Sequence, residues 1–543
     1  MFNNSRFSNP ILLAFSDENK PIFLSENKII CGNDIIEKLD NYFLGFFSLK
    51  TKPKFLILSL IRDTLVVKEY SLNFSNFKVR KINIEDIDIR IVQDLYMDID
   101  ENVLYIVYQD INNNCNTLVI LKDNYTLCTN TLCLSYDIET FFNSSFFLIS
   151  NDRPGFGKAA KVIDINFNVL FEYDRFLSYC SNYLLFLIEY NEYELIVLKN
   201  MINNKTILSK RYNEPIINAK LLESEYIVLL LNKGKEIMVD IISIKMGGTI
   251  KVRELHNCNI EIHSVNSNYI TIKGTSMKEG IKWGYIDKNG TVFFSHNKNK
   301  REKINTDYFS KPYPITVHKP LESKPQKLLF SLHGGPESFE FDDLRYYDLY
   351  SEAIKKETAI VVLNYYGSAY QNYSSRKKAW KNWINVIKIT IDVIKEFQTV
   401  FHIKDSNIIL IGGSFGATLA LLIAANLNIK INKVIAIAPL MNLNHHLKKV
   451  SSEESEWFNE RFSVEEIKTV FDWKNFINDI KTEVYIIQGD NDSVLNYRDT
   501  LEAVKYANEK HLPWTLFTEV DVDHVPLTDE QRKNRFILIN NLI

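Results

Sequence analysis

The order of apolar and polar residues divides the chain into two parts of different character. In roughly the first 295 residues, short aromatic and β-branched runs alternate with clusters of Asn, Asp, Gly and Lys, which is typical of strands joined by turns. The runs recur at intervals of 37 to 49 residues, and four of the six intervals are 43. They open at Ile11, Lys54, Val103, Phe146, Tyr183, Tyr226 and Tyr269.

Most of these runs are followed by a second strand-like run, as 103–108 is by 117–121. A hairpin repeated at a period near 43 residues predicts a β-propeller of about seven four-stranded blades. Stacking the blades in a ring buries their faces and removes long exposed edges. We therefore expect residues 1–300 to form an N-terminal β-propeller domain. Two or three β-sandwich-like units are the alternative for this all-β region.

The pattern changes after a polar, basic stretch at 296–303, which we interpret as a linker. Beyond it, apolar runs alternate with helical segments such as 383–397 and 498–509. This alternation predicts a mostly parallel sheet with helices on both faces. The strand candidates are 327–332, 359–363, 407–411, 434–437, 483–487 and 514–517.

The third of these strands leads into the most informative motif of the chain. Gly412 and Gly416 flank Ser414 in the G-x-S-x-G spacing of a nucleophile elbow, between the strand and a helix of small and apolar residues. Such a turn strains the serine backbone and excludes bulk on either side, so glycine is required there. The motif predicts a nucleophilic serine and, for residues 301–543, a C-terminal α/β-hydrolase domain.

A serine nucleophile needs a base and an orienting acid, which α/β-hydrolases carry in the chain order Ser, acid, His. Asp492 follows the strand at 483–487, and His524 follows the strand at 514–517. Because parallel strands end at the same edge of a sheet, we expect Ser414, Asp492 and His524 to form a catalytic triad. Asp490 is a rival for the role of the acid.

The oxyanion formed on acyl attack needs donors that are already in place. We expect the backbone N–H of Phe415, next after the nucleophile, to be one of them. The second donor should come from the loop after an earlier strand. The His-Gly-Gly-Pro sequence at 333–336 is such a loop, because its glycines let backbone N–H groups approach the site.

Composition and charge narrow the class of protein further. A net charge of −3 argues against nucleic acid as the main partner. The sequence has no apolar run of about 18 residues, so we expect no membrane span, and it shows no secretory signal. Six scattered cysteines without a C-x-x-C pair indicate reduced thiols in a cytoplasmic protein. We expect no cofactor or metal, since the adjacent His445 and His446 would point in different directions on a helix.

Together these residues resemble the prolyl oligopeptidase family of serine peptidases, with a loop closest to its acylaminoacyl-peptidase-like members. The resemblance covers about residues 305 to 543 by motif, and the N-terminal part by architecture alone. The matching strings are His333-Gly334-Gly335-Pro336, Asn364-Tyr365-Tyr366-Gly367-Ser368, Gly412-Gly413-Ser414-Phe415-Gly416, Gly489-Asp490-Asn491-Asp492-Ser493-Val494 and the His524 loop.

The resemblance implies a propeller ahead of the hydrolase domain, and an active site that only short peptides reach, in a cavity between the two domains. It also implies that Asp492 rather than Asp490 is the acid, and that the N–H of Gly335 is the second oxyanion donor. Among the residues of this chain, we expect substrate contacts from His333, Tyr366, Trp457 and Phe458.

Three positions depart from the family pattern. Tyr366 stands where the family usually has Arg, Ala417 where it has a second Gly, and Asp523 where it has Gly before the histidine. None of these changes removes a catalytic atom, so they bear on substrate preference.

The sequence thus predicts a serine peptidase that cleaves short peptides or acyl-peptides through an acyl-enzyme on Ser414. An esterase or a dedicated peptide-tailoring hydrolase is the first alternative, because a triad and an oxyanion hole serve amides and esters alike. A non-catalytic scaffold built on the propeller is the second. Residue preference, exo- or endo-action and oligomeric state stay open.

Overall fold

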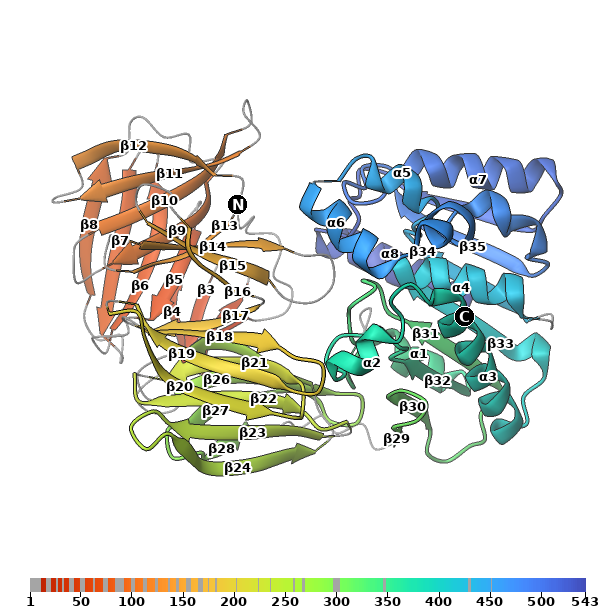
Figure 1. Cartoon of the computed structure of the whole chain (residues 1–543), viewed down its shortest axis with the longest axis horizontal. Coiled ribbons are helices and arrows are strands. Elements are labelled where there is room, and N and C mark those ends of the chain that lie inside the picture. The colour runs from red at the N-terminus through yellow and green to blue at the C-terminus, as the bar shows by residue number, and fades with distance from the viewer. Residues whose placement is uncertain are drawn as a thin grey trace.

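A computed structural model covers all 543 residues of the chain. It describes residues 175–543 apart from short gaps, and before Arg175 it describes the strands and the side chain of Val162. The gaps are 181–182, 202, 223, 235, 257–258, 266–268, 296–302, 345–347, 428–430 and 451, and at 251–254, 256, 452 and 453 only the backbone is described. A β-rich N-terminal part and an α/β C-terminal part lie side by side (Figure 1).

The strands described in the N-terminal part form seven four-stranded antiparallel sheets, each made of consecutive strands. The first four sheets comprise β1 (Ile11–Phe15), β2 (Pro21–Ser25), β3 (Lys28–Cys31), β4 (Asp34–Lys38), β5 (Phe43–Ser48), β6 (Lys54–Ile61), β7 (Thr64–Ser71), β8 (Phe77–Asn83), β9 (Val92–Asp98), β10 (Val103–Asp110), β11 (Cys115–Lys122), β12 (Thr126–Leu134), β13 (Asp137–Phe142), β14 (Phe146–Asp152), β15 (Lys158–Asp164) and β16 (Val169–Tyr173). The last three comprise β17 (Arg175–Cys180), β18 (Tyr183–Glu189), β19 (Glu194–Asn200), β20 (Lys205–Tyr212), β21 (Ile216–Leu222), β22 (Tyr226–Asn232), β23 (Glu236–Ser243), β24 (Gly248–His256), β25 (Asn259–Val265), β26 (Tyr269–Ser276), β27 (Gly280–Asp287) and β28 (Val292–Phe294).

First strands of successive sheets lie against one another, β17 against β21 and β21 against β25. β1 also lies against β25, so the first and last sheets are neighbours, as closure of a propeller ring requires. The predicted N-terminal β-propeller of about seven blades is confirmed, in place of the alternative of separate β-sandwich-like units.

The repeat predicted from the apolar runs is the blade repeat. Six of the seven predicted openings coincide with the first residue of the second strand of a blade, as Tyr183 does for β18 and Tyr226 for β22. The second strand can be buried on both faces, as in β22, where residues 227–232 are all buried, and such a strand has an unbroken apolar sequence. Ile11 is the exception, because it opens the first strand of its blade.

Eight strands of the C-terminal part form one sheet in the order β29-β30-β32-β31-β33-β34-β35-β36. The six strands from β32 to β36 run parallel, and β29 and β30 pair antiparallel at one edge. The strands are β29 (Ile304–Phe309), β30 (Ile315–Pro320), β31 (Lys327–Leu332), β32 (Thr358–Leu363), β33 (Ile408–Gly413), β34 (Lys433–Ile437), β35 (Glu483–Gly489) and β36 (Trp514–Glu519). The α-helices are α1 (Leu349–Lys355), α2 (Tyr373–Lys377), α3 (Trp383–Phe401), α4 (Phe415–Asn426), α5 (Leu443–Leu447), α6 (Ser452–Arg461), α7 (Tyr497–Glu509) and α8 (Asp529–Leu542).

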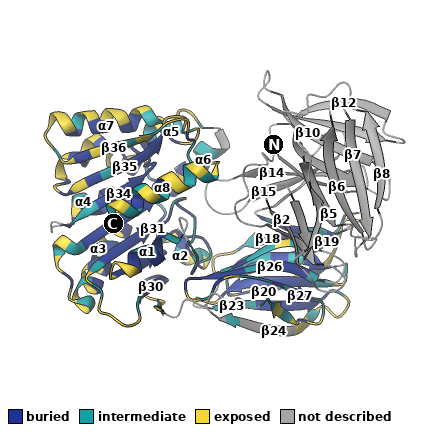
Figure 2. Cartoon of the chain, turned by 180° about the vertical axis from the view of Figure 1, so that it is seen from behind, coloured by how far each residue is buried: buried dark blue, intermediate teal, exposed yellow. Residues whose placement is uncertain are grey.

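Helices cover both faces of this sheet, and side chains of each strand alternate between the two layers. In β33, Ile408 and Leu410 join the core beneath α3, α4 and α7, whereas Ile409 and Ile411 join the core beneath α1 and α8. These four side chains are at most 1% exposed, and the central strands lie within the buried interior (Figure 2). Because both faces are covered, these strands have continuous apolar sequences, and the predicted α/β-hydrolase sheet is confirmed.

The edge strands β29 and β30 were not predicted. Polar residues such as Asp307 and His318 interrupt them, so neither forms an unbroken apolar run. His318 is nevertheless fully buried, and its ring bonds to the Thr306 hydroxyl at 3.0 Å.

The expected domain boundary and most of the cysteine side chains lie outside the described residues. The expected division at 300/301 and all of the expected linker at 296–303 except Lys303 fall on residues 296–302, which lie outside the described part of the chain. Of the six cysteines, one side chain is described, that of Cys180, which is buried and free of any disulfide.

None of the described helices combines the length and the apolarity needed to cross a lipid bilayer.

Candidate active site

Ser414 occupies the turn between β33 and α4. Its backbone has φ 54° and ψ −126°, a left-handed conformation that is strained for a residue with a Cβ. Its N–H donates to the carbonyl of Ile437 in the neighbouring strand β34, at 2.8 Å. The strand, turn and helix of the predicted elbow are therefore present, with the serine at the N-terminus of α4.

Close backbone contacts require both glycines of the motif. A Cβ on Gly412 would lie 2.3 Å from the carbonyl oxygen of Gly416, and a Cβ on Gly416 would lie 2.3 Å from the carbonyl oxygens of Leu332 and His333. Both distances are far below van der Waals contact. Ala417, one of the departures from the family pattern, is fully buried in the core, where its methyl group is accommodated.

The Asp492 carboxylate and the His524 ring are in direct contact. Nδ1 of the ring lies 3.1 and 3.0 Å from the two carboxylate oxygens. Gln488 Nε2 and the N–H groups of Val494 and Leu495 also donate to this carboxylate. The Asp492 side chain is fully buried, and the His524 ring is 15% exposed. The ring therefore turns Nδ1 to the acid, and Nε2 is the nitrogen directed away from it.

The hydrogen bonds decide the charge of Asp492. Burial raises the pKa of this carboxyl, but the bonds from His524 and from the Leu495 N–H outweigh burial and hold the pKa below its ordinary value. Asp492 is consequently ionised at neutral pH, as an acid that orients an imidazole must be.

Two neighbouring carboxylates have other partners. Asp490, the rival for the acid, accepts the N–H of Asp521 at 2.8 Å. Asp523 Oδ1 accepts the N–H and the hydroxyl of Ser493, each at 2.8 Å, and the N–H of His524 at 2.6 Å. Burial raises the pKa of Asp523, but the hydrogen bonds from Ser493 outweigh burial. The pKa of Asp523 therefore lies below its ordinary value. Asp523 thus ties the loop of the acid to the loop of the histidine.

Ser414 and His524 line one cavity of about 390 Å³. The described contacts include no hydrogen bond between the serine hydroxyl and the ring, so the two side chains share the cavity without a direct bond. All residues described around this cavity belong to the hydrolase part, including Gly334, Val525 and Phe536.

The loop after β31 lies directly against the nucleophile. A Cβ on Gly334 would be 3.2 Å from the Cβ of Ser414, so this residue has little room for a side chain. Gly335 has φ 119°, which favours glycine, and Phe415 is 2% exposed at the start of α4. The loop and the helix N-terminus are therefore adjacent. That the N–H groups of Gly335 and Phe415 bind an oxyanion stays a prediction.

The four residues expected to contact substrate do not line the Ser414 cavity. His333 is fully buried, with Nε2 2.6 Å from the Ser368 hydroxyl. Trp457 and Phe458 are 6% and 4% exposed, and both pack into the core. Tyr366 is half-buried, and its hydroxyl donates to the carbonyl of Pro312 at 2.8 Å.

Two arginines of α8 hold the histidine loop and were missed by sequence reasoning. Arg535 forms an ion pair with Glu519 and donates to the carbonyl of His524 at 3.4 Å. Arg532 donates to the carbonyl of Pro526 at 3.2 Å. Both also line the cavity. They belong to no motif, and the sequence carries no signal that places a terminal helix on this loop.

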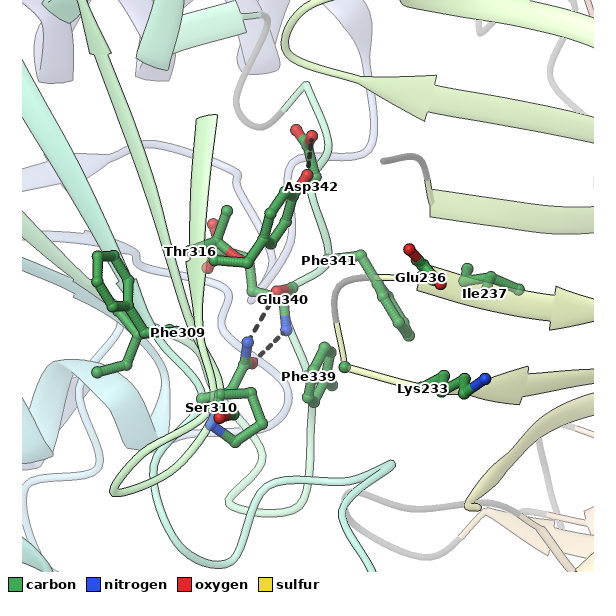
Figure 3. Close-up of a pocket in the computed structure, with 15 residues that line it drawn as sticks. Lys233, Glu236, Ile237, Phe309, Ser310, Thr316, Phe339, Glu340, Phe341 and Asp342 are labelled. Carbon is green, nitrogen blue, oxygen red and sulfur yellow. Dashed lines mark hydrogen bonds between the residues drawn. The ribbon is translucent and has the colours of Figure 1, made fainter. Parts of the chain in front are cut away.

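A second cavity of about 300 Å³ lies between the propeller and the hydrolase sheet, and it includes none of the predicted triad residues. Phe339 and Phe341 project into it opposite Lys233 and Glu236 of the propeller (Figure 3). Within the described part of the chain, no group of three or more His, Cys, Asp or Glu side chains is arranged to hold a metal ion.

Comparisons with known proteins agree with the fold. A model of the prolyl oligopeptidase family matches residues 348–539. The chain is similar in structure to an acylaminoacyl peptidase of Pyrococcus horikoshii, with 12% identity, a TM-score of 0.72, and coverage of 99% of this chain and 95% of that one. A puromycin-hydrolysing peptidase of Mycobacterium tuberculosis gives 11% identity, a TM-score of 0.68, and coverage of 99% and 94%. A search of curated proteins finds no match. At these identities the structural likeness establishes the fold.

The pKa of Asp492 leads to a prediction about stability. Because the folded-state pKa lies below the ordinary value of 3.8, ionised Asp492 stabilises the fold above that pH, and the contribution is lost as pH falls through the folded-state pKa. The difference in free energy of unfolding between wild type and Asp492→Asn should be full near about pH 5 and should shrink toward about pH 3. Denaturant unfolding at both pH values measures it, and a difference that does not shrink contradicts the assignment.

Proposed function

We propose that this chain, which belongs to the prolyl oligopeptidase family of serine peptidases, cleaves short peptides through an acyl-enzyme on Ser414. The observation that carries the proposal is the contact between the buried Asp492 carboxylate and the His524 ring. The same ring lines one cavity together with Ser414. The elbow conformation of Ser414 supports the same role.

The reaction would proceed in two steps. His524 Nε2 takes the proton of Ser414 as the hydroxyl oxygen attacks the scissile carbonyl, and the ionised Asp492 stabilises the imidazolium that forms. The oxyanion lies between the N–H groups of Phe415 and Gly335. The imidazolium then protonates the leaving amine, the C–N bond breaks, and the acyl group stays on Ser414. Water, activated by the same ring, releases the acid and restores the serine.

The substrate we propose is a short peptide or an N-acylated peptide. Two proteins of similar structure support this choice, since one is an acylaminoacyl peptidase and the other a puromycin-hydrolysing peptidase. A cytoplasmic setting is part of the proposal, and it rests on the scarcity of cysteine and on the free thiol of Cys180.

A fluorophosphonate probe tests whether Ser414 is the nucleophile. We expect stoichiometric labelling of the wild-type chain, and complete loss of labelling and of peptide cleavage in Ser414→Ala. Ser406→Ala is a matched control, since that serine is exposed and lies outside the Ser414 cavity, and it should leave labelling unchanged. Equal labelling of wild type and Ser414→Ala would contradict the assignment. Hydrolysis of p-nitrophenyl esters without cleavage of aminoacyl amides would favour an esterase.

A matched pair of variants tests which carboxylate is the acid. Asp492→Asn should lower kcat by about 10⁴-fold, because the ring loses the partner that fixes its tautomer. Asp490→Asn, two residues away, should keep kcat close to wild type, since the asparagine oxygen can still accept the N–H of Asp521. Steady-state kinetics on one peptide amide measures both. The reverse order of effects would transfer the role to Asp490.

A further inference from the structure

The loop that lies against Ser414 continues along the propeller. Phe341 packs against the apolar core of the sixth and seventh blades, which includes Ile237 and Ile260. Asp342 Oδ1 accepts the N–H of Met277 at 2.8 Å, from the turn between β26 and β27. One segment, 333–343, therefore touches the nucleophile at one end and the propeller at the other. Figure 3 shows the propeller end, where Phe341 faces Glu236 and Ile237.

Glu337 is the anchor in the middle of this segment. It is 2% exposed, and its Oε1 accepts Arg461 Nε at 2.7 Å and Trp380 Nε1 at 3.1 Å. The Arg461 guanidinium itself lies over two indoles, 4.3 Å from the ring centre of Trp380 and 4.1 Å from that of Trp457. The Glu337 carboxylate is thus fixed from the side of α6.

The turn at Gly335 depends directly on where Glu337 lies. A Cβ on Gly335 would be 2.6 Å from the Glu337 nitrogen and 2.8 Å from that of Ser338, so the chain folds tightly back on itself. The backbone nitrogens of Glu337 and Ser338 therefore pack directly against Gly335, whose N–H is the proposed oxyanion donor.

Arg376 connects Glu337 to the propeller. It lies on α2, is 2% exposed, and places NH2 2.7 Å from Glu189 Oε2 at the end of β18. Its NH1 lies 3.9 Å from Glu337 Oε2. The sequence of charges is Glu189, Arg376, Glu337, Arg461, alternating in sign and almost wholly buried. Charges in such surroundings interact strongly, and removing one leaves its partners uncompensated.

We propose that Arg376 is a positioning residue for the oxyanion site: Glu189 of the propeller holds Arg376, Arg376 holds Glu337, and Glu337 sets the turn that presents the Gly335 N–H. The inference rests on the proposed function, since it assigns a role in the same acyl transfer. The propeller then contributes to the chemical step through a side chain that lies outside the substrate cavity.

The test uses full-length variants and an oxyanion-dependent readout. Arg376→Met should lower kcat by about 10- to 100-fold with KM nearly unchanged, because a misplaced donor weakens the transition state and not the bound substrate. The fluorophosphonate labelling rate and the affinity for a peptide aldehyde, which forms a tetrahedral adduct, should fall in proportion. Arg376→Lys keeps the charge and should recover part of kcat.

Two further variants make the result interpretable. Lys210→Met removes an ion pair inside the propeller, with Asp240 at 3.0 Å, and should leave kcat unchanged. Glu189→Gln removes the propeller end of the charge chain with little change of shape, and kcat should fall in the same direction by a smaller factor. If Arg376→Met does not fold, the kcat of Glu189→Gln tests the positioning role instead.

The outcomes separate the two claims. If wild type is active and both Arg376→Met and Glu189→Gln keep its kcat and labelling rate, the positioning role is wrong while the proposed function stands. A rise in KM with kcat unchanged would also overturn it, since it would place the network in substrate binding. A wild-type chain that neither cleaves peptides nor reacts at Ser414 overturns the proposed function and this role with it.

Discussion

Two backbone segments meet at the nucleophile with no side chain between them, and the rest of the site depends on this contact. Gly416 lies against the carbonyl oxygens of Leu332 and His333, and Gly334 lies against Ser414. A methyl group at Gly416 would push the elbow away from the loop after β31, and one at Gly334 would crowd Ser414. The distance from nucleophile to proposed oxyanion donors is therefore set by main-chain atoms, which cannot repack as side chains do.

Hydrogen-bond partners, and not residue type, distinguish the three carboxylates at this edge of the sheet. Asp490 and Asp523 bind backbone N–H groups and join neighbouring loops. Asp492 alone among them contacts the His524 ring, and the bonds that it accepts keep it ionised although it is buried. The two joining carboxylates hold the loops together, so that the third can hold the imidazole.

The sequence allowed much of this to be predicted, for local reasons. Strand β33 is apolar throughout because helices cover both faces, and the spacing around Ser414 follows from contacts within one turn. Strands β29 and β30 were missed because polar residues interrupt them. The link from Glu337 to Arg376 was also missed, since it joins separate loops with no recurring spacing. The burial of His333 against the Ser368 hydroxyl was not predicted either, since it depends on tertiary packing.

The central claim is that these segments assemble one acyl-transfer site, and a crystal structure with a peptidyl boronate tests it most directly. The account predicts boron bonded to Ser414 Oγ, one boronate oxygen within about 3 Å of the Phe415 and Gly335 nitrogens, and another within about 3 Å of His524 Nε2. A boronate bound at another residue, or an adduct on Ser414 whose oxygens reach neither nitrogen, would contradict it.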